Sequence, residues 1–134
     1  MVELKQRLTD AKNRHLIISS IVLIFVAMTY GIVPNKLLPI FFDIRIETVD
    51  LMHVFRAMMG LYLGIIGLFI LGILKTQYWA TATCVNVAFM GGLAVGRLLS
   101  IAVDGWPSPV FSMGLLVEMG FAMWGLFNIK RYNN

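Results

Sequence analysis

The chain alternates long apolar runs with short polar stretches. Four runs each approach the roughly 20 apolar residues that an α-helix needs to cross a hydrocarbon core of about 30 Å. They occupy approximately residues 16–33, 51–74, 79–103 and 109–129. Because the edge amides of an open sheet would lack hydrogen-bond partners in lipid, the runs predict helices. We therefore predict an all-α integral membrane four-helix bundle, formed as a single domain over residues 1–134.

The longest connection, residues 35–50, lies between the first two runs. Its first half is too apolar for a free loop and too short to span a membrane. Its second half alternates Ile44 and Ile46 with charged neighbours, which is the period of an extended segment with one apolar side. We expect this outer segment to lie in the membrane interface and to cover the helix ends as a partial lid.

The composition agrees with this pattern and excludes a soluble globular domain. Hydrophobic residues make up 59% of the chain and charged residues only 13%, and the mean hydropathy is +0.82. A signal peptide is the alternative interpretation of the first run, because basic residues precede it. The run is long for a signal peptide and no small-residue cleavage site precedes Pro34, so a retained helix is favoured.

The distribution of basic residues predicts the orientation. A cytoplasmic N-terminus places seven basic residues on the cytoplasmic side, namely Lys5, Arg7, Lys12, Arg14, Lys75, Lys130 and Arg131. Only Lys36 and Arg45 then lie outside, so we expect both termini to be cytoplasmic. The basic residues flank apolar runs and form no continuous patch, which argues against nucleic acid as a partner.

Few residues suggest metal binding or catalysis. His15 and His53 are expected at opposite membrane edges, and the sequence has no Cys/His cluster. The single cysteine, Cys84, is expected to be a small buried apolar residue. We predict no metal, no cofactor and no catalytic residue, since no nucleophile with a nearby base can be recognised.

Two Gly-xxx-Gly pairs, Gly60 with Gly64 and Gly92 with Gly96, lie within the second and third runs. Such pairs let helix backbones approach closely in lipid. We expect these two runs to pack against each other there, near the bilayer centre, with a homo-oligomer contact as the alternative. Leucine at Gly60 or Gly92 is then expected to destabilise the protein more than leucine at Gly125.

Arg56, Arg97 and Glu118 are ionisable residues within the runs, where charge is costly and usually paired or functional. At 1.5 Å per residue, Arg97 lies about 10 Å below the outer end of its helix and Glu118 about 14 Å below the start of the next. Side chains tilt toward the N-terminus of their own helix, so these two should approach each other and pair. Arg56 should point toward the outer interface.

Three interpretations of these charges remain open. They could form structural ion pairs, an outward-facing polar pocket for a lipid phosphate or small anion, or a proton relay through Glu118. Arginine suits the pocket because its planar fork binds oxyanions bidentately. The candidate ligand-binding residues are Arg56, Arg97, Glu118, His53, Asp104 and Ser100.

Several segments carry a resemblance to a known family. They are Phe42-Asp43, Asp50-Leu51, residues 53–64 (HVFRAMMGLYLG), residues 91–100 (GGLAVGRLLS), residues 104–109 (DGWPSP) and Glu118. Through them the chain resembles small bacterial four-helix membrane proteins of the domain-of-unknown-function 4345 family. The resemblance implies the same topology and a bacterial inner-membrane location, and it implies no activity.

We therefore expect a non-enzymatic membrane protein that binds a lipid or small anion, or acts as an accessory subunit. Its expected partners are membrane lipid and either further copies of itself or a larger membrane complex. The alternative is a small intramembrane enzyme of the trimeric four-helix type, an analogy of fold alone. Proton-coupled transport after oligomerisation is the third hypothesis.

Overall fold

The computed structural model describes residues 2–132, which form helices joined by short turns, with no strand in that range. The four long helices are α2 (Arg14–Gly31), α4 (Val49–Leu74), α5 (Trp79–Asp104) and α6 (Pro109–Tyr132). They begin and end within three residues of the predicted runs. Four helical segments are long and apolar enough to cross a membrane. The prediction of an all-helical chain with four such helices is confirmed.

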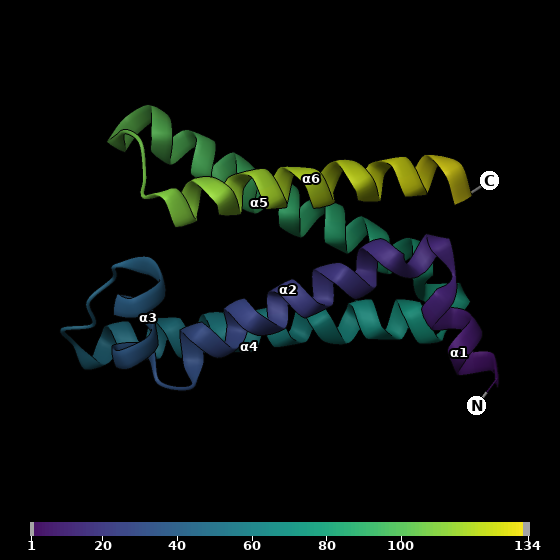
Figure 1. The fold of residues 1–134 in the computed structure, drawn as a ribbon, viewed down its shortest axis with the longest axis horizontal. Coiled ribbons are helices and arrows are strands. Elements are labelled where there is room, and N and C mark those ends of the chain that lie inside the picture. Colours follow the sequence, from purple (N-terminus) through teal and green to yellow (C-terminus); the bar gives the residue numbers. More distant parts are fainter. Residues whose placement is uncertain (1, 133–134) are drawn as a thin grey trace.

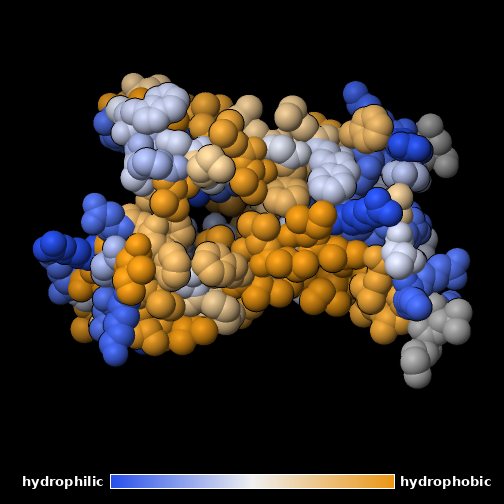
Figure 2. Space-filling view, viewed as in Figure 1, coloured by the Kyte–Doolittle hydropathy of each residue, from blue (hydrophilic) through white to orange (hydrophobic). Residues whose placement is uncertain are grey.

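The molecule has two polar ends and an apolar middle. The shorter helices are α1 (Val2–Thr9), η1 (Ala11–Asn13), α3 (Pro34–Phe42) and η2 (Thr76–Tyr78). Helix α1 and the last turn of α6 lie at one end, here called the terminal end, and α3 lies at the other, the α3 end (Figure 1). Figure 2 shows hydrophilic residues at both ends and a hydrophobic surface between them. This surface is suited to hydrocarbon around its middle.

The long helices pack as two pairs, α2 with α4 and α5 with α6. The pairs are close together at the terminal end and separate toward the α3 end (Figure 1). Helix α3 touches both pairs, because the Phe42 ring lies 5.6 Å from the ring of Tyr30 in α2 and 5.4 Å from that of Phe111 in α6. The separation leaves a hollow between the pairs that is visible in Figure 2.

The predicted outer segment is partly helical. Helix α3 begins with Pro34 in its first turn and ends at Phe42, and it is followed by Asp43, whose φ of 54° is left-handed. Beyond it the backbone is irregular up to Thr48, whose hydroxyl accepts a hydrogen bond from the Leu51 amide and caps α4. Ile44 and Ile46 are half-buried against the core while the charged residues between and beside them are exposed. The predicted alternation is therefore confirmed.

The predicted contact between the glycine pairs is wrong within the chain. A Cβ atom added at any of these glycines would meet no atom within 4 Å: Gly60, Gly64, Gly92 and Gly96. The rings of Tyr62 and Phe89, 5.2 Å apart, fill the space between α4 and α5 at this depth. The backbones come close together near η2, where Gly72 lies against Ala82. The homo-oligomer contact stays a prediction.

Close helix approaches occur at other glycines instead. A Cβ at Gly31 of α2 would overlap Met59 of α4, and a Cβ at Gly125 of α6 would lie 2.6 Å from a methyl group of Val87 in α5. Each pair of helices therefore contains a glycine where the other helix takes the space of a side chain. Gly125, where leucine was expected to destabilise less than at Gly60 or Gly92, is among the most confined of the described glycines.

Candidate functional site

Arg97 of α5 and Glu118 of α6 form a bidentate ion pair. The arginine Nε donates to Oε2 at 2.7 Å and Nη2 donates to Oε1 at 2.9 Å. The side chains retain only 23% and 10% of their exposed surface. The predicted contact between these residues is confirmed, and its geometry is the parallel fork that makes arginine–carboxylate pairs strong.

The residues one and two turns before Glu118 shape the space for the guanidinium. Gly114 precedes it by one turn of α6, and a Cβ there would lie 3.5 Å from Nη2 of Arg97. Phe111, one turn earlier still, places its ring 5.0 Å from the guanidinium carbon. Helix α6 thus places three groups around the same arginine: a carboxylate, a glycine that leaves room for the guanidinium, and an aromatic ring.

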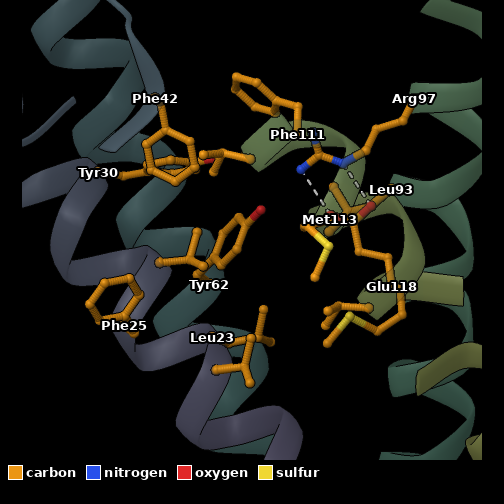
Figure 3. A pocket seen from close by; sticks show the side chains of 16 residues that line it. Leu23, Phe25, Tyr30, Phe42, Tyr62, Leu93, Arg97, Phe111, Met113 and Glu118 are labelled. Atoms are coloured by element: carbon orange, nitrogen blue, oxygen red, sulfur yellow. Dashed lines mark hydrogen bonds and ion pairs between the residues drawn. The ribbon is translucent and has the colours of Figure 1, made fainter. Parts of the chain in front are cut away.

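An apolar cavity of about 210 Å³ lies beside this pair, between the two helix pairs. Its lining comes from α2, α3, α4, α5 and α6: Val22, Leu23, Phe25, Val26, Tyr30, Phe42, Tyr62, Met90, Leu93, Arg97, Val110, Phe111, Met113, Gly114, Val117 and Glu118. Figure 3 shows Tyr30 and Tyr62 opposite Arg97, with the Tyr62 hydroxyl directed toward the guanidinium. One helix pair therefore supplies phenol groups and the other the ion pair.

A second cavity of about 250 Å³ adjoins the first toward the α5–α6 turn. It is lined by Arg97, Ser100, Ile101, Gly105, Pro107 and Phe111, so Arg97 and Phe111 belong to both cavities. The Ser100 hydroxyl donates to Asp104 Oδ2 at 2.9 Å. Gly105 has a φ of +95°, a conformation that few other residues adopt, and it ends α5 there. Arg97 lies at the junction of the apolar cavity and a more polar one.

The structure brings together only part of the predicted site. Arg97, Glu118 and Ser100 line the two cavities, and Asp104 is hydrogen-bonded to Ser100.

The other two predicted site residues lie elsewhere. Within residues 2–132, the lining of the two cavities includes neither Arg56 nor His53, and both are exposed. The prediction that they share this pocket is wrong. The core face of α4 is the one that carries Tyr62, Ile66 and Phe69, and the 100° rotation per residue turns Arg56 and His53 away from it.

Comparison with known proteins identifies the family. Residues 11–128 match the family described as Domain of unknown function (DUF4345). The chain belongs to this family. The match covers both members of the ion pair and all of the cavity-lining residues named above. No curated protein and no solved structure matches the chain.

This DUF4345 member has a second buried polar cluster, near the terminal end, that the sequence interpretation missed. His15 of α2 is fully buried, and its Nε2 lies 3.2 Å from the Thr83 hydroxyl of α5 while its Nδ1 lies 2.8 Å from the Asn128 amide nitrogen of α6. Thr83 donates its own hydroxyl proton to the Trp79 carbonyl at 2.8 Å. Thr83 therefore accepts from Nε2, and Nδ1 accepts from Asn128, which describes a neutral imidazole with its proton on Nε2.

The cluster continues one turn toward the middle of the molecule. Asn86 of α5 donates to the Ser19 hydroxyl of α2 at 2.8 Å, and both side chains are buried. A signal was present in the sequence, because Ser19 follows His15 by four residues and Asn86 follows Thr83 by three, which places each set on one helix face. Polar residues with helical spacing inside apolar runs predict contacts between helices.

The expected burial of the single cysteine is wrong. Cys84, expected to be buried, is exposed on α5, because the buried face of that helix carries Ala82, Thr83 and Asn86. Among residues 2–132, no three His, Cys, Asp or Glu side chains lie together as metal ligands would.

Proposed function

We propose that this DUF4345 member is a non-enzymatic integral membrane protein that binds a lipid between its two helix pairs. The observation that carries the proposal is the position of Arg97. Its guanidinium, paired with Glu118, lies where an apolar cavity meets a more polar one. This arrangement suits an amphipathic molecule, with its hydrocarbon in the first cavity and its polar group in the second.

The proposal includes the placement in the membrane. The two helix pairs would cross a bacterial inner membrane together as one four-helix bundle, with the terminal end in the cytoplasm. The supporting observations are the apolar middle of the surface (Figure 2) and the excess of basic residues near the termini. The two cavities and α3 would then lie in the outer half of the membrane.

The size and chemistry of the cavities fit such a ligand. A cavity of about 150 Å³ lined by apolar side chains is enough to hold a benzene ring, and the first cavity here measures about 210 Å³. Glu118 occupies two of the five N–H donors of the Arg97 guanidinium. Glu118 leaves three donors unused, and Tyr30 lies near them, so a polar group can still bind to the guanidinium without breaking the ion pair.

The test is lipid retention by variants in which the cavity is filled. Leu93 lines the first cavity, whereas Leu99 lies six residues further along α5 and is 62% exposed. Protein carrying Leu93→Trp should lose the lipid that native mass spectrometry detects after purification in mild detergent, because the indole would occupy the space of the hydrocarbon. Protein carrying Leu99→Trp should retain it.

A second variant tests whether lipid is lost because the cavity is filled or because the protein misfolds. Val117 lines the same cavity from α6, and Val117→Trp should also remove the lipid while the thermal unfolding temperature shows that the helices stay packed. Retention of the same lipid by the folded Leu93 and Val117 variants would overturn the proposed function. So would equal loss from the Leu99 variant.

A further inference from the structure

The positive charge at the site is already matched by acidic groups before a ligand enters. The positive charge of Arg97 is matched by Glu118, which holds it through two short hydrogen bonds. The next charged group along α5 is Asp104, joined to the cavity-lining Ser100 by a hydrogen bond of 2.9 Å. These three residues carry charges of +1, −1 and −1, so no positive charge is left over for an anion.

We infer that the ligand has an uncharged, hydrogen-bond-accepting head group, such as a hydroxyl or ester carbonyl, on a hydrocarbon tail. This inference rests on the proposed function and names its ligand class. A neutral oxygen can accept from the three guanidinium N–H groups that Glu118 does not use. The Tyr62 hydroxyl, directed toward the same guanidinium in Figure 3, supplies a further polar contact.

Anionic and cationic head groups both fit the site less well, because each would meet a side chain of its own charge. An anionic head would approach the guanidinium beside the buried Glu118 carboxylate, and like charges repel strongly where water is largely excluded. A cationic head would meet Arg97 itself, which lines both cavities. The anionic ligand expected from the sequence required a second arginine, and Arg56 is exposed on another face of α4.

The experiment compares three amphiphiles that share one alkyl chain length and differ in charge: a monoacylglycerol, an alkyl phosphate and an alkyltrimethylammonium. Each is titrated into the purified full-length protein in detergent, and binding is measured by native mass spectrometry. The monoacylglycerol should bind about tenfold or more tightly than either charged amphiphile, since the net cost of a buried uncompensated charge exceeds that of a neutral polar group. Leu93→Trp should abolish this binding.

The matched variant is Glu118→Gln, which keeps the shape of the side chain and removes its charge. Arg97 is then uncompensated, and the alkyl phosphate should become the preferred ligand. Asp104→Asn changes an exposed residue at the end of α5, so it tests the inference even if the Glu118 variant fails to fold. It should narrow the preference for the monoacylglycerol over the alkyl phosphate, because it removes one negative charge near the second cavity. Glu47→Gln, an exposed acidic residue outside both cavities, should leave the preference unchanged.

The outcomes separate this inference from the proposed function. Tighter binding of either charged amphiphile by the unaltered protein, lost on Leu93→Trp, would overturn the neutral head group and leave lipid binding in place. An unchanged preference in the folded Glu118→Gln and Asp104→Asn variants would also overturn the inference. Binding of all three amphiphiles that is insensitive to Leu93→Trp would overturn the proposed function itself, and this inference with it.

Discussion

Two sets of buried polar side chains hold helices together in this protein, and they connect different partners. The His15 set joins α2 to α5 and α6 through Thr83 and Asn128, so it crosses from one helix pair to the other. The ion pair of Arg97 and Glu118 joins α5 only to α6, within one pair. Hydrogen bonds between the helix pairs hold them together at the terminal end, whereas the ion pair lies within one helix pair, beside the cavity.

His15 and Arg97 also differ in the hydrogen-bonding atoms that they leave without a partner. Both ring nitrogens of His15 have partners, and its ring packs between Trp79 and Trp124 with centroid distances of 6.1 and 6.2 Å. Arg97 keeps three N–H donors beyond those that Glu118 accepts, and it lines two cavities. A histidine whose two ring nitrogens both have partners serves packing, whereas an arginine with unused donors beside a cavity is suited to binding.

The largest expected effect is the loss of one member of the ion pair. Arg97→Met or Glu118→Met should each lower the free energy of unfolding by about 3 kcal/mol or more, because each leaves an uncompensated buried charge. The double substitution should recover much of this loss. The measurement is a double-mutant cycle of unfolding free energies in detergent, and additive single effects would contradict the structural importance of the pair.

Arg56→Met is the matched control for that cycle. Arg56 is exposed and lies outside both cavities, so its loss should change the unfolding free energy by no more than about 0.5 kcal/mol and should leave lipid retention intact. This expectation reverses the one that follows from the sequence, which placed Arg56 in the pocket. Loss of the lipid from this variant would show that Arg56 takes part in lipid binding.

A middle-sized effect is expected at the terminal end. His15→Leu should lower the unfolding free energy by about 2 kcal/mol, because the amide of Asn128 and the hydroxyl of Thr83 lose a buried partner. The matched control is His53→Leu, which changes an exposed histidine of the same chain and should have little effect. Thermal unfolding of the two variants provides the comparison, and equal stabilities would mean that the His15 set does not hold the pairs together.

The smallest effect concerns the glycines. Gly125→Ala should destabilise by about 1 kcal/mol, because the new methyl group would press on Val87. Gly92→Ala should be neutral or slightly stabilising, since its Cβ would meet no atom within 4 Å and alanine favours the helix. Unfolding of both variants in detergent tests the contrast. If the Gly92 variant is destabilised and native mass spectrometry shows that it no longer forms an oligomer present in the unaltered protein, this glycine contacts a second copy of the chain.

How far along its helix a residue lies could be predicted from the order of the residues. Hydropathy located the four long helices, and the rise per residue with the tilt of side chains toward the N-terminus was enough to predict the contact of Arg97 with Glu118. Membership of the DUF4345 family was also recognisable from the residues themselves. These inferences depend on distance along a helix axis, which the order of residues specifies directly.

Which side of each helix packs against the others could be seen only in the folded protein. Arg56 and Gly60 lie on the exposed side of α4 because Tyr62, Ile66 and Phe69 occupy the packed side. In a soluble protein an apolar stripe would have marked the buried face, but a helix in lipid is apolar all round. The rotation of each helix is therefore set by side-chain packing between helices, and so is the gap between the pairs in which the cavity lies.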